Sequence, residues 1–132
     1  MVVKIYLDSC IVIYLIEGAG PLQTAVQTAI RENSIKAFCV SELVRLECKV
    51  GPMKRSQKKL LEEYDRFFEN VSVLEMNKNV FESATLLRAT HTLKTPDALH
   101  LACAMHNQCD EFWTNDNHLT GISRKIKIRT LP

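Results

Sequence analysis

The sequence predicts an α/β layered fold with a largely parallel sheet, for two reasons. Short apolar stretches rich in β-branched residues alternate along the chain with longer stretches whose apolar residues recur at helical spacing. Parallel strands need a crossover between them, usually a helix, so this alternation of strands and helices favours a parallel sheet.

Length and composition fit one domain over residues 1–132. The chain has 132 residues, of which 46% are hydrophobic and 24% are charged, close to the averages of folded domains. A chain of this length buries roughly two-thirds of its unfolded surface, enough for an ordinary core. The sequence contains no internal repeat that would divide it.

The first elements are a strand and two helices. The β-branched, apolar run 2–7 indicates a buried strand. Ser9 begins a helix with apolar residues at helical spacing, and the Gly- and Pro-containing stretch 18–21 is expected to break it. A second helix is predicted over residues 22–31.

The next stretch predicts a strand at 35–40 and two further helices. Ser41 is placed to cap the first of them, and Gly51-Pro52 is expected to end it. The second, 56–68, is polar on one face and apolar on the other.

The last third of the chain continues the alternation. The same patterns predict, in order, a strand at 71–74, helices at 80–93 and 95–107, and strands at 111–114 and 126–128.

Four acidic residues stand where these elements meet. Asp8 follows the first strand directly, and Asp116 lies just beyond the strand 111–114. Glu47 is two turns into its helix, and Asp97 is in the first turn of another. Each alone could be a helix cap, a turn residue or an acid that favours a helix N-terminus. Because ligands bind at the carboxyl ends of parallel strands, their joint placement predicts one acidic site.

Such a site needs a cation. Two carboxylates about 4 Å apart repel by roughly 4 kcal/mol at an effective dielectric near 20. No His- or Cys-rich ligand set accompanies the acids, which favours Mg²⁺ or Mn²⁺ over zinc. We expect Asp8, Asp97 and Asp116 to hold one or two ions, directly or through water. Glu47 either completes the metal shell or orients the attacking water, and the sequence leaves both open.

Four strings carry a resemblance to a known family. They are Tyr6-Leu7-Asp8-Ser9, residues 41–47 with Gly51 following, Thr95-Pro96-Asp97-Ala98-Leu99-His100, and Thr114-Asn115-Asp116. Together they resemble the signatures of PIN-domain nucleases, in the right order and over essentially the whole chain. The most similar branch is the VapC-type toxins of toxin–antitoxin pairs.

The resemblance implies a fold and an activity. It implies a PIN-like three-layer sandwich with a central, mainly parallel sheet of four or five strands flanked by helices. Asp8, Glu47, Asp97 and Asp116 match the family's acidic quartet. It also implies a metal-dependent endoribonuclease that leaves a 5′-phosphate and a 3′-hydroxyl, a homodimer, and a small antitoxin that covers the acidic site.

Two hydroxyl residues and one cysteine complete the comparison of motifs. Thr114 matches the family's frequent hydroxyl neighbour of the last acid, and Ser9 matches a small hydroxyl residue after the first. Both are expected to position an acid, a water or a phosphate oxygen. Cys10 departs from the family, which commonly has Asn or another small polar residue there.

Basic residues are candidates for RNA contact. The net charge is only +2, but 17 Lys and Arg residues would face 11 remaining acids if four of the 15 bind metal. Such a surface would attract a polyanion. The group predicted to bind RNA is Arg45, Lys49, Lys54 and Arg55. Solvated helix faces explain these residues equally well.

His100 and Trp113 have structural interpretations that outweigh functional ones. His100, three residues after Asp97, is expected to pack or to form hydrogen bonds rather than act as a general base. Trp113 is expected in the core rather than as a platform for a base. Three functions compete: a toxin ribonuclease, a housekeeping PIN-domain nuclease that processes RNA without an antitoxin, and a catalytically silent RNA- or protein-binding module. The presence of all four acids argues against the last.

The cysteines and the apolar runs favour a cytoplasmic location. The five cysteines are odd in number and form no Cys-x-x-Cys pair, so most are expected to be core residues. The apolar run 11–16 is far too short to span a bilayer, and no targeting signal is evident. No membrane partner is therefore expected.

Overall fold

The computed structural model describes residues 2–32 and 36–131, in which strands and helices alternate. The elements are β1 (Val3–Leu7), α1 (Ser9–Glu17), α2 (Gly20–Arg31), β2 (Lys36–Ser41), α3 (Glu42–Lys54), α4 (Lys58–Glu69), β3 (Ser72–Leu74), α5 (Lys78–Thr90), α6 (Thr95–His106), β4 (Glu111–Thr114), the short 3₁₀ helix η1 (Asn117–Leu119) and β5 (Lys127–Thr130).

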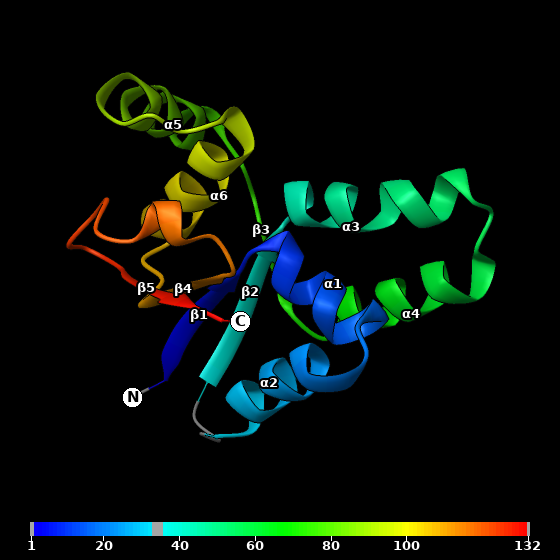
Figure 1. Cartoon of the computed structure of the whole chain (residues 1–132). Coiled ribbons are helices and arrows are strands. Elements are labelled where there is room, and N and C mark those ends of the chain that lie inside the picture. Colours follow the sequence, from blue (N-terminus) through cyan, green and yellow to red (C-terminus); the bar gives the residue numbers. More distant parts are fainter. Residues whose placement is uncertain (1, 33–35, 132) are drawn as a thin grey trace.

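All five described strands form one parallel sheet, in the order β3-β2-β1-β4-β5. The first strand of the chain is therefore the central one, and Tyr6 in β1 stands opposite Cys39 in β2 and Phe112 in β4. The α/β fold with a parallel sheet is confirmed. Because every strand runs the same way, all carboxyl ends meet at one edge of the sheet (Figure 1).

Helices cover both faces of this sheet. Side chains of a strand alternate between faces, and Tyr6 reaches α6, where its hydroxyl contacts His100. Leu7 and Phe38 point to the opposite face, where they line one depression with Leu15 of α1, Ile30 of α2 and Phe67 of α4. Figure 1 shows α5 and α6 on one side of the sheet and α1 and α2 on the other. The three layers are confirmed.

The strand β4 supplies the largest core side chain. Trp113 is fully buried, as the sequence predicts. The ammonium of Lys36 and the guanidinium of Arg129 each lie 4.9 Å from its ring centroid, an arrangement in which the ring attracts both cations. Its indole nitrogen donates to a carboxylate oxygen of Glu111 at 3.0 Å. These contacts connect Trp113 of β4 with side chains of β2 and β5.

The cysteines are core residues, as expected. All five are free thiols; Cys39, Cys48, Cys103 and Cys109 are buried and Cys10 is half-buried.

No single helix within 2–32 and 36–131 is long and apolar enough to cross a membrane. Helices α1 and α2 reach that length and apolarity only when taken together, with a bend of 113° between them. The cytoplasmic location stays a prediction.

The expected end of α3 at Gly51-Pro52 is wrong. The helix continues to Lys54, and Pro52 lies buried inside it. Proline removes one backbone hydrogen bond, but here only the last turn loses it, and burial of the ring against the neighbouring structure offsets the loss.

The predicted bounds of three other helices also shift. Helix α2 begins at Gly20 rather than residue 22, because Pro21 suits a first helical turn. Helix α4 begins at Lys58 rather than residue 56, because Ser56 has a positive φ of 54°. Helix α5 begins at Lys78, capped by the side chain of Asn77, and ends at Thr90. Ile35, expected to begin the second strand, lies outside the described residues.

Two glycines should respond oppositely to alanine. A Cβ at Gly18 would lie 2.2 Å from the backbone oxygen of Tyr14, so backbone must move. We expect Gly18→Ala to lower the free energy of unfolding by about 1–3 kcal/mol. Gly51 is inside α3 and a Cβ there meets only the guanidinium of Arg55 at 3.2 Å, which can swing away. Gly51→Ala should therefore be neutral or stabilise by up to about 1 kcal/mol. Urea unfolding of both variants measures the contrast, and equal losses would contradict it.

Candidate active site

Asp8 is held at the carboxyl end of β1 by neutral donors. The residue is only 7% exposed. One carboxylate oxygen accepts from the backbone N–H of Ser9 at 2.8 Å, and the other accepts from the hydroxyl of Thr114 at 2.8 Å. The backbone N–H of Asp8 donates to the oxygen of Trp113 at 3.0 Å, which extends the pairing of β1 with β4. Asp8 is thus both the cap of α1 and a fixed carboxylate.

Thr114 connects two of the predicted acids. Its hydroxyl donates to Asp8 and accepts from the backbone N–H of Asp116 at 3.1 Å. The residue is fully buried at the end of β4. A single hydroxyl therefore sets the spacing between the end of β1 and the turn that carries Asp116, the positioning role expected for Thr114.

Asp116 begins the short helix η1. Its carboxylate accepts from the backbone N–H of His118 at 2.9 Å and contacts the His118 ring nitrogen Nδ1 at 2.7 Å. The backbone N–H of His118 lowers the pKa of this carboxyl below its usual value, and the His118 ring and Lys94 add to the effect. Asp116 is therefore readily ionised.

Glu47 reaches the same edge from α3. Its carboxylate oxygen Oε1 lies 2.5 Å from the ring nitrogen Nε2 of His100, which is 3.7 Å from the Oδ1 atom of Asp8. The imidazole of His100 in α6 thus stands between carboxylates from two other elements. His100 is 1% exposed, which agrees with the expected hydrogen-bonding histidine.

Asp97 differs from the other three acids in its hydrogen bonding. Its side chain forms no hydrogen bond to any residue in the described part of the chain. Burial raises the pKa of its carboxyl, as do Asp8 and Asp116, with a smaller contribution from Glu47. All three other acids therefore lie near enough to act on this one carboxyl, and their shared role as a catalytic quartet stays a prediction.

A cleft of about 280 Å³ opens beside Asp97 and Asp116. Its remaining lining residues are Thr92, Leu93, Lys94 and His118. The sequence analysis missed Lys94 and His118 as site residues. The position of His118, two residues after an aspartate in a turn, is a usable signal, because Asp side chains commonly bind the backbone two residues on.

The donor chemistry of the site fits a hard divalent cation. All four acids offer carboxylate oxygens, the ligands that Mg²⁺ and Mn²⁺ prefer. Burial, followed by the negative charges of Asp8 and Asp116, raises the pKa of Asp97, and His100 offsets only part of this effect. Over 2–32 and 36–131, however, no three Asp, Glu, His or Cys side chains lie close enough to share one ion as they stand. Asp8, Glu47 and Asp116 are instead turned to their own donors.

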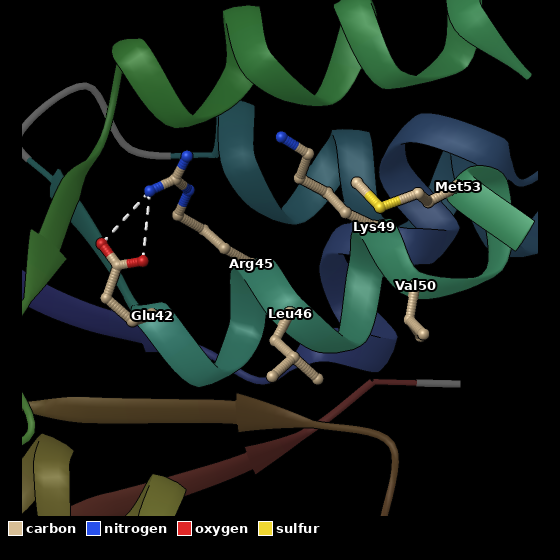
Figure 2. A pocket seen from close by; sticks show the side chains of 6 residues that line it. All are labelled: Glu42, Arg45, Leu46, Lys49, Val50 and Met53. Atoms are coloured by element: carbon tan, nitrogen blue, oxygen red, sulfur yellow. Dashed lines mark hydrogen bonds and ion pairs between the residues drawn. The ribbon is translucent and has the colours of Figure 1, made fainter.

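The predicted RNA-binding group lies elsewhere on α3. Arg45 pairs with Glu42 at 3.1 Å, and Lys49 pairs with Asp65 of α4 at 2.5 Å. Figure 2 shows both basic side chains extending toward α4. Glu47, by contrast, contacts His100 of α6. Lys54 and Arg55 are exposed at the end of the helix. The structure does not bring these four residues to the acids, and their role stays a prediction.

Comparison with known proteins places this arrangement in a family. The family model described as "PIN domain" matches residues 5–125. The chain belongs to the PIN-domain family. The resemblance seen in the sequence is thereby confirmed. A search of curated protein sequences found no match.

Solved structures share the PIN fold over nearly the full chain. A toxin–antitoxin complex from Klebsiella pneumoniae has 21% identity, covers 95% of each chain and gives a TM-score of 0.77. DNA-bound VapBC from Salmonella typhimurium has 18% identity, coverage of 97% of this chain and 98% of that chain, and a TM-score of 0.79. Mycobacterium tuberculosis VapC20, a sarcin-ricin loop cleaving toxin, has 13% identity, coverage of 97% and 99%, and a TM-score of 0.74. At these identities the similarity concerns the fold.

The raised pKa of Asp97 should be visible in how the stability of the metal-free protein depends on pH. Its folded pKa is raised, so the ionised carboxyl destabilises the fold at neutral pH, and protonation removes this cost as pH falls toward the ordinary value of 3.8. Asp97→Asn should therefore melt at a higher temperature than the parent at pH 7 in EDTA, and the difference should shrink toward pH 4.

Asp116→Asn should change the stability of the fold in the opposite direction. Its lowered pKa means that the ionised carboxyl stabilises the fold above the ordinary value and that this stabilisation is lost as pH falls. Asp116→Asn should be the less stable variant at pH 7. Thermal unfolding of both proteins from pH 4 to 8 makes the comparison, and loss of stability in Asp97→Asn at every pH would show a structural cap instead.

Proposed function

We propose that this protein is a Mg²⁺- or Mn²⁺-dependent endoribonuclease and the toxin of a toxin–antitoxin pair. The observation that carries the proposal is the Asp97 carboxyl, whose pKa is raised by burial and also by Asp8, Asp116 and Glu47. Four acids from four separate elements have no structural reason to meet at one sheet edge, because they repel. Membership of the PIN family supports a nuclease.

The metal would be held by Asp8, Asp97 and Asp116, with Glu47 acting through water. A carboxylate oxygen has two lone pairs, so the Asp8 oxygens can accept their present donors and still face a cation. When bound, the ion would lower the pKa of a water molecule and stabilise charge on the scissile phosphate. PIN-domain nucleases generally use divalent metals, which supports this assignment.

The chain's own residues would do the positioning. Thr114 and the Ser9 backbone fix both oxygens of Asp8, so this carboxylate cannot rotate away. Lys94 stands at the rim of the cleft beside Asp97 and Asp116, where its ammonium can meet an RNA phosphate. RNA is further supported by the name of VapC20, which cleaves the sarcin-ricin loop, and by the excess of basic residues outside the acidic site.

An antitoxin is the proposed protein partner. Solved complexes that share this fold are toxin–antitoxin assemblies by name. A basic side chain of such a partner, placed at the acidic site, would satisfy the same charge that a metal ion satisfies. The antitoxin is expected to be small and to cover this edge of the sheet.

A second copy of the chain is the proposed partner for α3. Leu46, Val50 and Met53 are 61%, 45% and 62% exposed and recur at helical spacing along one stripe. Figure 2 shows Leu46 and Val50 on the side of α3 away from α4. The stripe has acidic Glu42 at one end and basic Lys54 at the other. Two antiparallel copies would pair these ends, as a twofold interface requires.

Removing the acids should abolish cleavage. We expect Asp97→Asn and Asp116→Asn each to lower the rate of Mg²⁺-dependent RNA cleavage at least about 100-fold, since metal charge stabilisation is lost. Glu62→Gln, an exposed acid on α4, is the matched control and should keep full activity. Circular dichroism verifies folding, and sequencing of RNA ends identifies the cleaved site. Undiminished activity in both Asn variants would end the nuclease proposal.

The oligomeric state should depend on the stripe. Met53→Glu places a negative charge at the end of the stripe that would face Glu42 of the second copy, and it should convert dimer to monomer in size-exclusion chromatography with light scattering. Leu22→Glu, at an exposed apolar position on α2, is the control and should remain dimeric. A monomeric parent protein, or a dimeric Met53→Glu variant, would contradict this interface.

A further inference from the structure

A buried chain of polar side chains ends at Glu47. The hydroxyl of Tyr6 lies 2.7 Å from the hydroxyl of Ser41 and 2.8 Å from the ring nitrogen Nδ1 of His100. The other ring nitrogen, Nε2, lies 2.5 Å from the Glu47 carboxylate. Tyr6 and Ser41 are fully buried and His100 nearly so. None of the three is among the acids, and none was predicted as a site residue.

A neutral His100 ring would give the donors and acceptors in this chain one direction. An ionised carboxylate only accepts hydrogen bonds, so Nε2 of His100 carries a proton and donates to Glu47. In the neutral ring Nδ1 then has a lone pair and accepts from the Tyr6 hydroxyl. The Tyr6 oxygen accepts in turn from the Ser41 hydroxyl. Every proton in the sequence Ser41, Tyr6, His100, Glu47 is used once, and no buried polar atom in it is left without a partner.

The chain closes on the helix that carries Glu47. The Ser41 oxygen accepts from the backbone N–H of Val44 at 3.3 Å and so caps α3. The same hydroxyl therefore starts α3 and, through Tyr6 and His100, contacts the Glu47 side chain two turns later. One buried oxygen thus helps to position both the helix backbone that carries Glu47 and the Glu47 carboxylate.

Glu47 needs such a restraint. A glutamate side chain has several rotatable bonds, and this one is 28% exposed, so water is accessible to it. Asp8 repels it from the acidic edge, since the same His100 nitrogen that bonds Glu47 is 3.7 Å from the Asp8 carboxylate. A fixed N–H between the two carboxylates opposes that repulsion.

We propose that Tyr6 and His100 are positioning residues that hold the Glu47 carboxylate at the acidic cluster through a one-way hydrogen-bond chain beginning at Ser41. This inference rests on the proposed metal-dependent nuclease. The proposal concerns how Glu47 is oriented and assigns no proton transfer to the histidine.

Tyr6→Phe is the most specific test, because it removes one oxygen and keeps the ring stacked on Phe112, 5.3 Å away. The phenol oxygen touches no acid, so a role in structure alone would leave the site intact. Groups that orient a ligating side chain typically contribute 10–100-fold to metal affinity or activity. We expect kcat to fall about 10-fold with KM unchanged, and Mn²⁺ binding measured by electron paramagnetic resonance to weaken by a similar factor.

Tyr64→Phe is the matched control. Tyr64 is also fully buried, and its hydroxyl donates to the carboxylate of Glu17 at the far end of α1. Its loss should lower the melting temperature by an amount comparable with Tyr6→Phe and leave kcat and Mn²⁺ affinity unchanged. At the histidine itself, His100→Leu should lose activity, and His100→Gln, which retains a side-chain N–H, should recover part of it.

Nitrogen-15 NMR of the metal-free protein tests the hydrogen-bond chain directly. The parent should show His100 with its proton on Nε2 and none on Nδ1, and Tyr6→Phe should reduce that preference. An Nδ1 proton in the parent, or equal Mn²⁺ affinity in parent and Tyr6→Phe, would overturn the chain. If the parent itself neither binds Mn²⁺ nor cleaves RNA, the nuclease proposal fails, whereas the histidine spectrum still decides the hydrogen-bond chain.

Discussion

Repulsion among like charges is the constraint on which this structure depends. Carboxylates that meet at one edge of a sheet would turn outward unless donors held them. The hydroxyl of Thr114 holds Asp8 and the imidazole of His100 holds Glu47. Asp97 has no such donor among the described residues, and it is the acid whose pKa is raised. Burial and the neighbouring acids therefore both disfavour the ionised form of this one carboxyl.

The parallel sheet is what brings these groups together. In β1 and β4 the register pairs Leu7 with Trp113, so the residues that follow, Asp8 and Thr114, emerge side by side. The same register allows the Thr114 hydroxyl to reach the Asp8 carboxylate. An antiparallel pair would have sent these two chain ends to opposite edges. The site thus follows from strand direction before any side chain is considered.

Patterns local in sequence predicted much of this arrangement. Asp8 and Asp116 were located from the strands that precede them, and the alternation of strands and helices predicted the parallel sheet that positions them. The partnership of Tyr6 with His100 could not be predicted, because 94 residues separate them and no spacing rule connects a strand to a later helix. Only the general requirement that a buried tyrosine hydroxyl find a partner pointed to it. The continuation of α3 past Pro52 was missed for a related reason: its compensation is burial.

The donors at the site restrain the acids without neutralising them. The Ser9 backbone N–H and the Thr114 hydroxyl, which hold Asp8, carry no net charge, so these donors do not neutralise its carboxylate. Had the fold used buried Arg or Lys side chains instead, the charge would have been balanced internally and no cation would be attracted. The cluster therefore still attracts positive charge beside Asp97. A metal ion and a basic side chain of an antitoxin would compete for the same place beside the acids. Inhibition by an antitoxin that replaces the metal's charge would then follow directly from how the acids are held.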